Sequence, residues 1–204
     1  MAIIDDISRD LDWREAEIAS MRLLLSRRDI SSKQVEVLLR AAWALLYAHY
    51  EGFIKYCLTL FYEEISARSV KCENLPNPTQ IFALAKVLKQ IRTMPPAEMI
   101  NEVTNFQSRH LDSVASFPEV DTDSNLWPET LIALLISADL DSKTVEENRP
   151  KLATLVARRN EIAHGQKNFI AEFRYYRTYE TAVYEVMYDL ALQVEERLAS
   201  SPYL

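Results

Sequence analysis

Residues 35–61 read VEVLLRAAWALLYAHYEGFIKYCLTLF, and this stretch decides the fold. Apolar side chains recur in it every three or four positions, which is the period of an α-helix that buries one face. We expect one long helix over residues 33–69, with Ser31 and Ser32 supplying its cap signal. A helix of this length with a continuous apolar face predicts that other helices pack along it.

The helical period continues on both sides of this stretch, and no segment shows the alternation of a strand. We expect further helices over residues 5–28, 79–92, 96–106 and 128–138, one from Arg149-Pro150 to Gly165, and a last one over 168–199. Proline-rich and polar residues predict loops at 74–78 and 117–128. The sequence therefore predicts an all-α antiparallel bundle with additional short helices, in a single domain over residues 1–204.

The composition excludes several classes of function. The chain of 204 residues has only two glycines, Gly52 and Gly165, so it has neither a dinucleotide-binding glycine motif nor a phosphate-binding P-loop. The net charge of −7 argues against a broad basic face for duplex nucleic acid, although a small local anion site remains compatible with it. The histidines and cysteines are too scattered to predict a metal site, and we expect no cofactor.

The sequence also indicates where the protein acts. Cys57 and Cys72 are too few for a disulfide framework, which favours a reducing compartment. The first residues lack the pattern of a signal peptide, and no apolar run is long enough to span a bilayer. We therefore expect a cytoplasmic protein without a membrane partner.

Residues 158–165, RRNEIAHG, are the one segment that suggests chemistry. On a helical wheel Arg159 falls in the middle of an apolar stripe, where its five donors need partners. Asn160 and His164 are i, i+4 neighbours on the adjoining face, and Gly165 is suited to close the helix. An arginine that binds oxyanions beside a histidine that transfers protons suits phosphodiester chemistry. The alternative is structural: Arg159 pairs with a buried glutamate or caps a neighbouring helix, and His164 only caps its own helix.

Residues 159–164 resemble the R-x4-6-H motif of the HEPN superfamily (higher eukaryotes and prokaryotes nucleotide-binding), in which a polar residue such as Asn160 commonly follows the arginine. Three segments resemble the compact bacterial MAE-type branch: residues 45–55 (LLYAHYEGFIK), residues 155–165 (LVARRNEIAHG) and the loop at residues 124–126. The resemblance covers residues 11–194 in the same order.

This resemblance implies a metal-independent endoribonuclease that forms a homodimer with a composite cleft and acts as a toxin or in antiphage defence. Arg159 would bind the scissile phosphate, His164 would transfer protons, and Asn160 would orient the phosphate or His164. RNA cleavage by 2′-hydroxyl attack would leave a 2′,3′-cyclic phosphate or 3′-phosphate and a 5′-hydroxyl. The tyrosine by which some HEPN toxins are silenced is absent, because Gly165-Gln166 follows His164.

Other residues support the site less directly. Arg158 and Lys167 flank the motif and are candidate RNA contacts, although surface solvation explains them equally well. His49 lies on the apolar stripe of the long helix, which favours a core histidine; the alternative places it, or Glu51, behind the cleft. Two other functions stay open: a non-catalytic helical module that binds nucleotide or protein, and a scaffold that pairs with an antitoxin or another defence protein.

Overall fold

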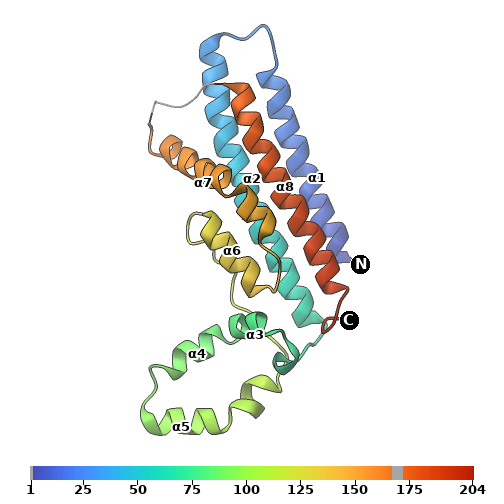
Figure 1. Cartoon of the computed structure of the whole chain (residues 1–204), viewed down its shortest axis with the longest axis vertical. Coiled ribbons are helices and arrows are strands. Elements are labelled where there is room, and N and C mark those ends of the chain that lie inside the picture. The colour runs from blue at the N-terminus through green and yellow to red at the C-terminus, as the bar shows by residue number, and fades with distance from the viewer. Residues whose placement is uncertain (1, 167–171) are drawn as a thin grey trace.

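A computed structural model describes residues 2–166 and 172–204, and within these residues it contains helices and no strand (Figure 1). The α-helices are α1 (Ala2–Leu25), α2 (Ser32–Ala67), α3 (Asn77–Ala83), α4 (Ala85–Ile91), α5 (Pro96–Thr104), α6 (Pro128–Ser137), α7 (Lys143–Ala163) and α8 (Phe173–Leu198). A short 3-10 helix (Cys72–Asn74) and a π-helical turn (Gln107–Leu111) lie between them. The all-α prediction is confirmed.

The long predicted helix is α2, and the other long helices pack around it. Its start is fixed by a capping box, because Ser31 Oγ accepts from the Gln34 N–H and Gln34 Oε1 accepts from the Ser31 N–H. α1, α7 and α8 all contact α2, and Figure 1 shows α1 and α7 running opposite to α2 and α8. α1 and α7 are therefore antiparallel to the central helix α2, and α8 is parallel to it.

The core of the bundle lies along α2. The predicted stripe is confirmed: Leu46, Phe53 and Cys57 are fully buried. A second row of α2 residues outside the predicted apolar face is buried as well: Trp43 packs against Tyr179 of α8, and Tyr62 packs against Phe82 and Phe117. This second row consists of Trp43, Tyr47, Ile54, Leu58, Tyr62 and Ile65.

The predicted start of α7 at Arg149-Pro150 is wrong, since the helix begins at Lys143 and Pro150 lies in its interior. Proline lacks the N–H that bonds the carbonyl four residues earlier, which locally disfavours this arrangement. Tertiary contacts outweigh that cost: Val145 and Asn148 are buried, and Asn148 Nδ2 donates to Glu185 Oε2 of α8 at 2.9 Å.

Other helix ends also differ from the sequence prediction. The expected helix over 79–92 is divided at the buried Leu84 into α3 and α4. The first helix ends at Leu25 rather than at residue 28. The last helix was expected from residue 168; residues 168–171 lie outside the described part of the chain, Glu172 is extended, and α8 begins at Phe173.

α4 and α5 form an arm, residues 85–104, which projects from the bundle in Figure 1. The chain leaves and re-enters the bundle at one place. There an isolated antiparallel bridge joins Lys71 to Val114, with hydrogen bonds from Cys72 N to Ser113 O and from Ala115 N to Val70 O, each at 2.9 Å.

No helix in the described residues combines the length and apolar character needed to cross a membrane.

Candidate active site at the end of α7

The end of α7 places the predicted motif at a defined helix terminus. Gly165 adopts a φ of +74°, so the prediction of a left-handed closing residue is confirmed. Its N–H donates to Ile162 O at 3.1 Å and the Gln166 N–H donates to Glu161 O at 2.9 Å, which is a Schellman motif. His164 is the last residue before this turn, and its side chain is exposed to solvent.

Arg40 of α2 ties this terminus to the bundle. Its Nη1 atom donates to the carbonyl oxygen of Gln166 at 2.6 Å. The backbone that follows the motif is therefore held from α2.

Arg159 points from α7 toward α2, as its place in the apolar stripe predicts. Its side chain is 24% exposed, and its Cζ atom lies 3.9 Å from the centroid of the Tyr47 ring. A guanidinium over an aromatic face is attracted by the negative charge density of that face. Glu51 lies one turn after Tyr47 on α2, and its Oε2 atom is 3.9 Å from Arg159 Nη2. Arg159 is thus oriented by two residues of one α2 face.

Tyr47 also holds the loop that precedes α6. Its hydroxyl accepts from the backbone N–H of Leu126 at 2.9 Å. Burial raises the pKa of the Tyr47 phenol, so the hydroxyl stays neutral. The loop turns through left-handed residues, with φ of 54° at Asp123 and 60° at Ser124. The Ser124-Asn125-Leu126 segment thereby contacts Tyr47, the residue whose ring packs against Arg159.

The guanidinium retains donor capacity in this setting. Glu51 Oε2 lies at ion-pair distance rather than hydrogen-bond distance from Arg159 Nη2, and the arginine side chain keeps part of its surface exposed. Arginine has five donors in a planar fork that matches a carboxylate or phosphate. The arrangement is therefore suited to accept an anion at the solvent side of Arg159.

The other motif residues form no side-chain hydrogen bond with Arg159 among the described residues. Asn160 is half-buried and His164 is exposed. Arg158 pairs with Glu161 at 2.8 Å, within its own helix. Lys167 lies outside the described residues.

Glu51 and His49, the two α2 residues predicted as candidates for a place behind the cleft, lie in different surroundings. Glu51 lies beside Arg159, whereas His49 faces α1, where its Nε2 atom is 3.0 Å from Glu17 Oε2 and its ring packs edge-on against Trp13. Burial, and next to it the charge of Arg14, lower the pKa of His49, so the imidazole is held neutral. The structure thus places His49 in the α1–α2 interface.

Gly52 makes room in that same interface. A Cβ atom at this position would lie 3.0 Å from Arg14 Nη1. The missing side chain allows the guanidinium of Arg14 to lie against α2, where its Nε donates to Asp10 Oδ2 at 2.6 Å.

Sequence reasoning missed Tyr47 and Arg40 as residues of this region. The available signal was the i, i+4 spacing of Tyr47 and Glu51, which puts both side chains on one helix face. The pairing of Arg40 with a backbone carbonyl beyond Gly165 has no sequence signal.

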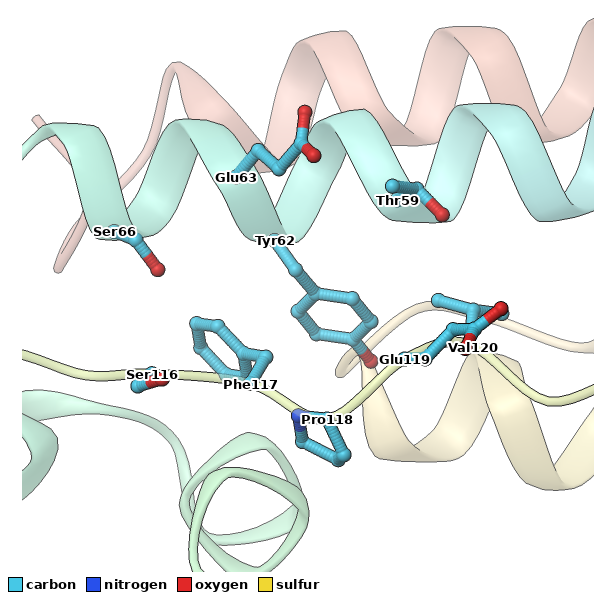
Figure 2. Close-up of a pocket in the computed structure, with 9 residues that line it drawn as sticks. All are labelled: Thr59, Tyr62, Glu63, Ser66, Ser116, Phe117, Pro118, Glu119 and Val120. Carbon is cyan, nitrogen blue, oxygen red and sulfur yellow. The ribbon is translucent and has the colours of Figure 1, made fainter.

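A cavity of about 440 Å³ lies elsewhere, between α2 and the segment 116–120. Figure 2 shows Tyr62 reaching from α2 toward this segment beside Phe117, and their ring centroids are 4.6 Å apart. None of the motif residues lines the cavity, so the candidate site is the surface at the end of α7.

The described residues contain no group of three or more His, Cys, Asp or Glu side chains placed to hold a metal ion.

Comparison with known proteins identifies the family of the chain. No curated protein and no solved structure matches the chain. A family model described as HEPN_MAE_28990-like HEPN matches residues 3–203, which is nearly the whole chain. This membership supports a role related to nucleotides or RNA. Because the family model matches nearly the whole chain, the protein belongs to the MAE_28990-like HEPN family.

Proposed function

We propose that this protein is a metal-independent endoribonuclease that works as a homodimer in the cytoplasm. The observation that carries the proposal is the orientation of Arg159, which Tyr47 and Glu51 hold at the bundle surface with donor capacity to spare. A preoriented guanidinium stabilises the charge that develops on a phosphate during attack, without reorganising first. Family membership supports RNA as the class of substrate.

The reaction needs no water and no metal in its first step. The 2′-oxygen of the RNA attacks the adjacent phosphorus, the bond from phosphorus to the 5′-oxygen breaks, and a 2′,3′-cyclic phosphate and a 5′-hydroxyl form. One proton leaves the 2′-hydroxyl and one is delivered to the 5′-oxygen. We assign Arg159 to the phosphate, His164 to proton transfer and Asn160 to orienting the phosphate or the imidazole.

A second copy of the chain completes this scheme. One chain supplies a single exposed histidine at the motif, and its side chain forms no hydrogen bond with Arg159 among the described residues. Two motifs that face one cleft would supply two imidazoles, one as base and one as acid. We further propose that such activity serves as a toxin or in antiphage defence, restrained by a partner such as an antitoxin.

Cleavage of labelled single-stranded RNA in excess chelator tests the proposal. We expect Arg159→Ala and His164→Ala each to lower the cleavage rate by about 100-fold or more. The matched control is Lys151→Ala, which removes an exposed cation of the same helix and leaves the rate within twofold. Analysis of product ends should find cyclic phosphate or 3′-phosphate. If both motif variants cleave as fast as the wild type, the assignment of the site is wrong.

The alternative is a non-catalytic binding module, and the internal contacts of Arg159 favour it. An arginine that packs on Tyr47 and pairs with Glu51 also joins α7 to α2. In that case Arg159→Ala lowers the melting temperature, and any RNA cleavage in the preparation persists unchanged.

A further inference from the structure

α4 presents three basic side chains to solvent. Lys86 and Lys89 lie on the helix, Arg92 is its C-cap, and all three are exposed. The spacing of three residues keeps them on one side of the helix, while Leu88 packs toward the core from the other side. None of the three forms an ion pair with another described residue, whereas basic residues such as Arg14 and Arg68 are paired.

The surrounding sequence leaves this charge uncompensated. Residues 74–97 contain these three basic residues and no Asp or Glu, and they form the longest stretch of the chain without an acidic residue. Since the whole chain has a net charge of −7, the remaining residues carry −10. The positive face of α4 is therefore a local exception in an acidic protein, and such a face attracts polyanions.

The exposed face of α4 lacks large apolar side chains, which suits the binding of a polyanion rather than of a protein. None of the large apolar side chains of α4 is among the exposed ones; Ala85 and Gln90 are the other exposed residues of the helix. Protein interfaces usually have an apolar centre, whereas contacts to a nucleic acid backbone depend on lysine and arginine charge.

The arm lies on the same flank of the bundle as the candidate site. α6 packs against α7, and α3 packs against α6 and leads directly into α4. Figure 1 shows α7, α6 and α4 along one side of the layer formed by α1, α2 and α8. An RNA strand bound at the end of α7 can therefore continue along this flank toward α4.

We propose that the basic face of α4, made of Lys86, Lys89 and Arg92, is a second contact for the phosphate backbone of the RNA substrate, away from the scissile bond. This inference rests on the proposed ribonuclease function, because it takes the same RNA as ligand. Lysine and arginine at helical spacing contact phosphates without reading bases, so the contact strengthens binding independently of sequence.

The test measures binding separately from cleavage. Both variants are made in the His164→Ala background, and a labelled 20-nucleotide oligouridylate is titrated at 50–200 mM salt. The test variant is Lys86→Glu with Lys89→Glu and Arg92→Glu. The control carries the same change in charge at three exposed cations on separate segments: Arg9→Glu with Arg28→Glu and Lys143→Glu.

We expect the α4 variant to bind the RNA at least tenfold more weakly than the control at 50 mM salt. Its salt dependence should also be shallower by about 2 in log–log slope, because three phosphate contacts each release about 0.7 counterion. The corresponding triple glutamine variant, which is neutral, should show the same direction of effect and guards against misfolding of the charge-reversed arm.

Equal binding by the α4 variants and the control overturns the inference, and it does so even if the wild type cleaves RNA. Conversely, weaker binding by the α4 variants together with a wild type that cleaves no RNA overturns the ribonuclease proposal and leaves the RNA-binding surface in place.

Discussion

Tyr47 contacts Arg159 through its ring and Leu126 through its hydroxyl. Arg159 Cζ lies 3.9 Å from the ring centroid, and the hydroxyl accepts a hydrogen bond from the Leu126 N–H at 2.9 Å. One side chain of α2 thus joins the motif of α7 to the loop before α6. Because the two contacts use different atoms, substitution can remove them one at a time.

Tyr47→Phe should separate stability from cleavage. The variant keeps the ring beneath Arg159 but leaves the buried Leu126 N–H unpaired, which lowers the free energy of unfolding by about 1–3 kcal/mol. We expect its cleavage rate to stay within threefold of the wild type. Tyr47→Leu also removes the aromatic face, so its single-turnover rate should fall by tenfold or more. Equal rates in the two variants would show that the ring does not position Arg159.

Glu51→Gln should strengthen the binding of phosphate. The substitution removes the carboxylate that lies 3.9 Å from Arg159 and competes with an incoming anion. A 2′-deoxy oligonucleotide, which has no attacking hydroxyl, should bind the variant severalfold more tightly than the wild type. Glu63→Gln is the control, because it removes an exposed carboxylate from the same helix. A 100-fold loss of cleavage with unchanged affinity would instead place Glu51 in proton transfer.

His49 makes the protein less stable in acid. Its pKa in the folded state lies below that of a free histidine, chiefly because it is buried, so below about pH 6.5 the unfolded chain takes up a proton that the folded protein resists. Stability is therefore complete above the unfolded pKa and is lost as the pH falls toward the folded pKa. The melting temperature should fall less between pH 7.5 and pH 5 in His49→Gln than in the wild type.

The same variant tests where His49 acts. Arg14, Glu17 and Asp10 are the charged groups whose interactions with the imidazole shift its pKa, and Arg159 is not among them. Cleavage by His49→Gln at pH 7.5 should therefore equal that of the wild type within twofold. A larger loss would connect the α1–α2 interface with the chemistry.

Gly165→Ala should weaken the end of α7 through the backbone alone. An added Cβ meets no atom within 4 Å, but the φ of +74° costs an alanine about 1–2 kcal/mol. Asparagine tolerates this conformation better, so Gly165→Asn should lose less free energy of unfolding. Cleavage should fall in the same order, because the turn sets the position of His164. Equal stability of the two variants would contradict the role of the left-handed turn.

The fold could be predicted largely from local periodicity, because the burial of α2 and the place of Arg159 in a stripe depend only on helical spacing. Pro150 shows where local rules fail: the contact from Asn148 to Glu185 on α8 extends α7 beyond a residue that normally begins a helix. The break at Leu84 likewise has no glycine or proline signal beside it.

Only the α7 residues of the candidate site could be predicted from the sequence. Arg159, Asn160 and His164 follow from one short segment, whereas Tyr47 as the partner of Arg159 depends on which face of α2 meets α7. That choice is made by packing between helices more than 100 residues apart in sequence. The i, i+4 spacing of Tyr47 and Glu51 shows that the two share a face of α2, but it does not show which helix covers that face.

The bridge between Lys71 and Val114 has a consequence for how this fold can diversify. Since the chain departs and returns through one pair of neighbouring residues, the arm of α4 and α5 can lengthen, shorten or change its charge while both attachment points stay fixed. α3, which packs against α6, stays with the bundle. Under the proposed function, changes in the arm would therefore alter the binding of RNA without altering the site at the end of α7.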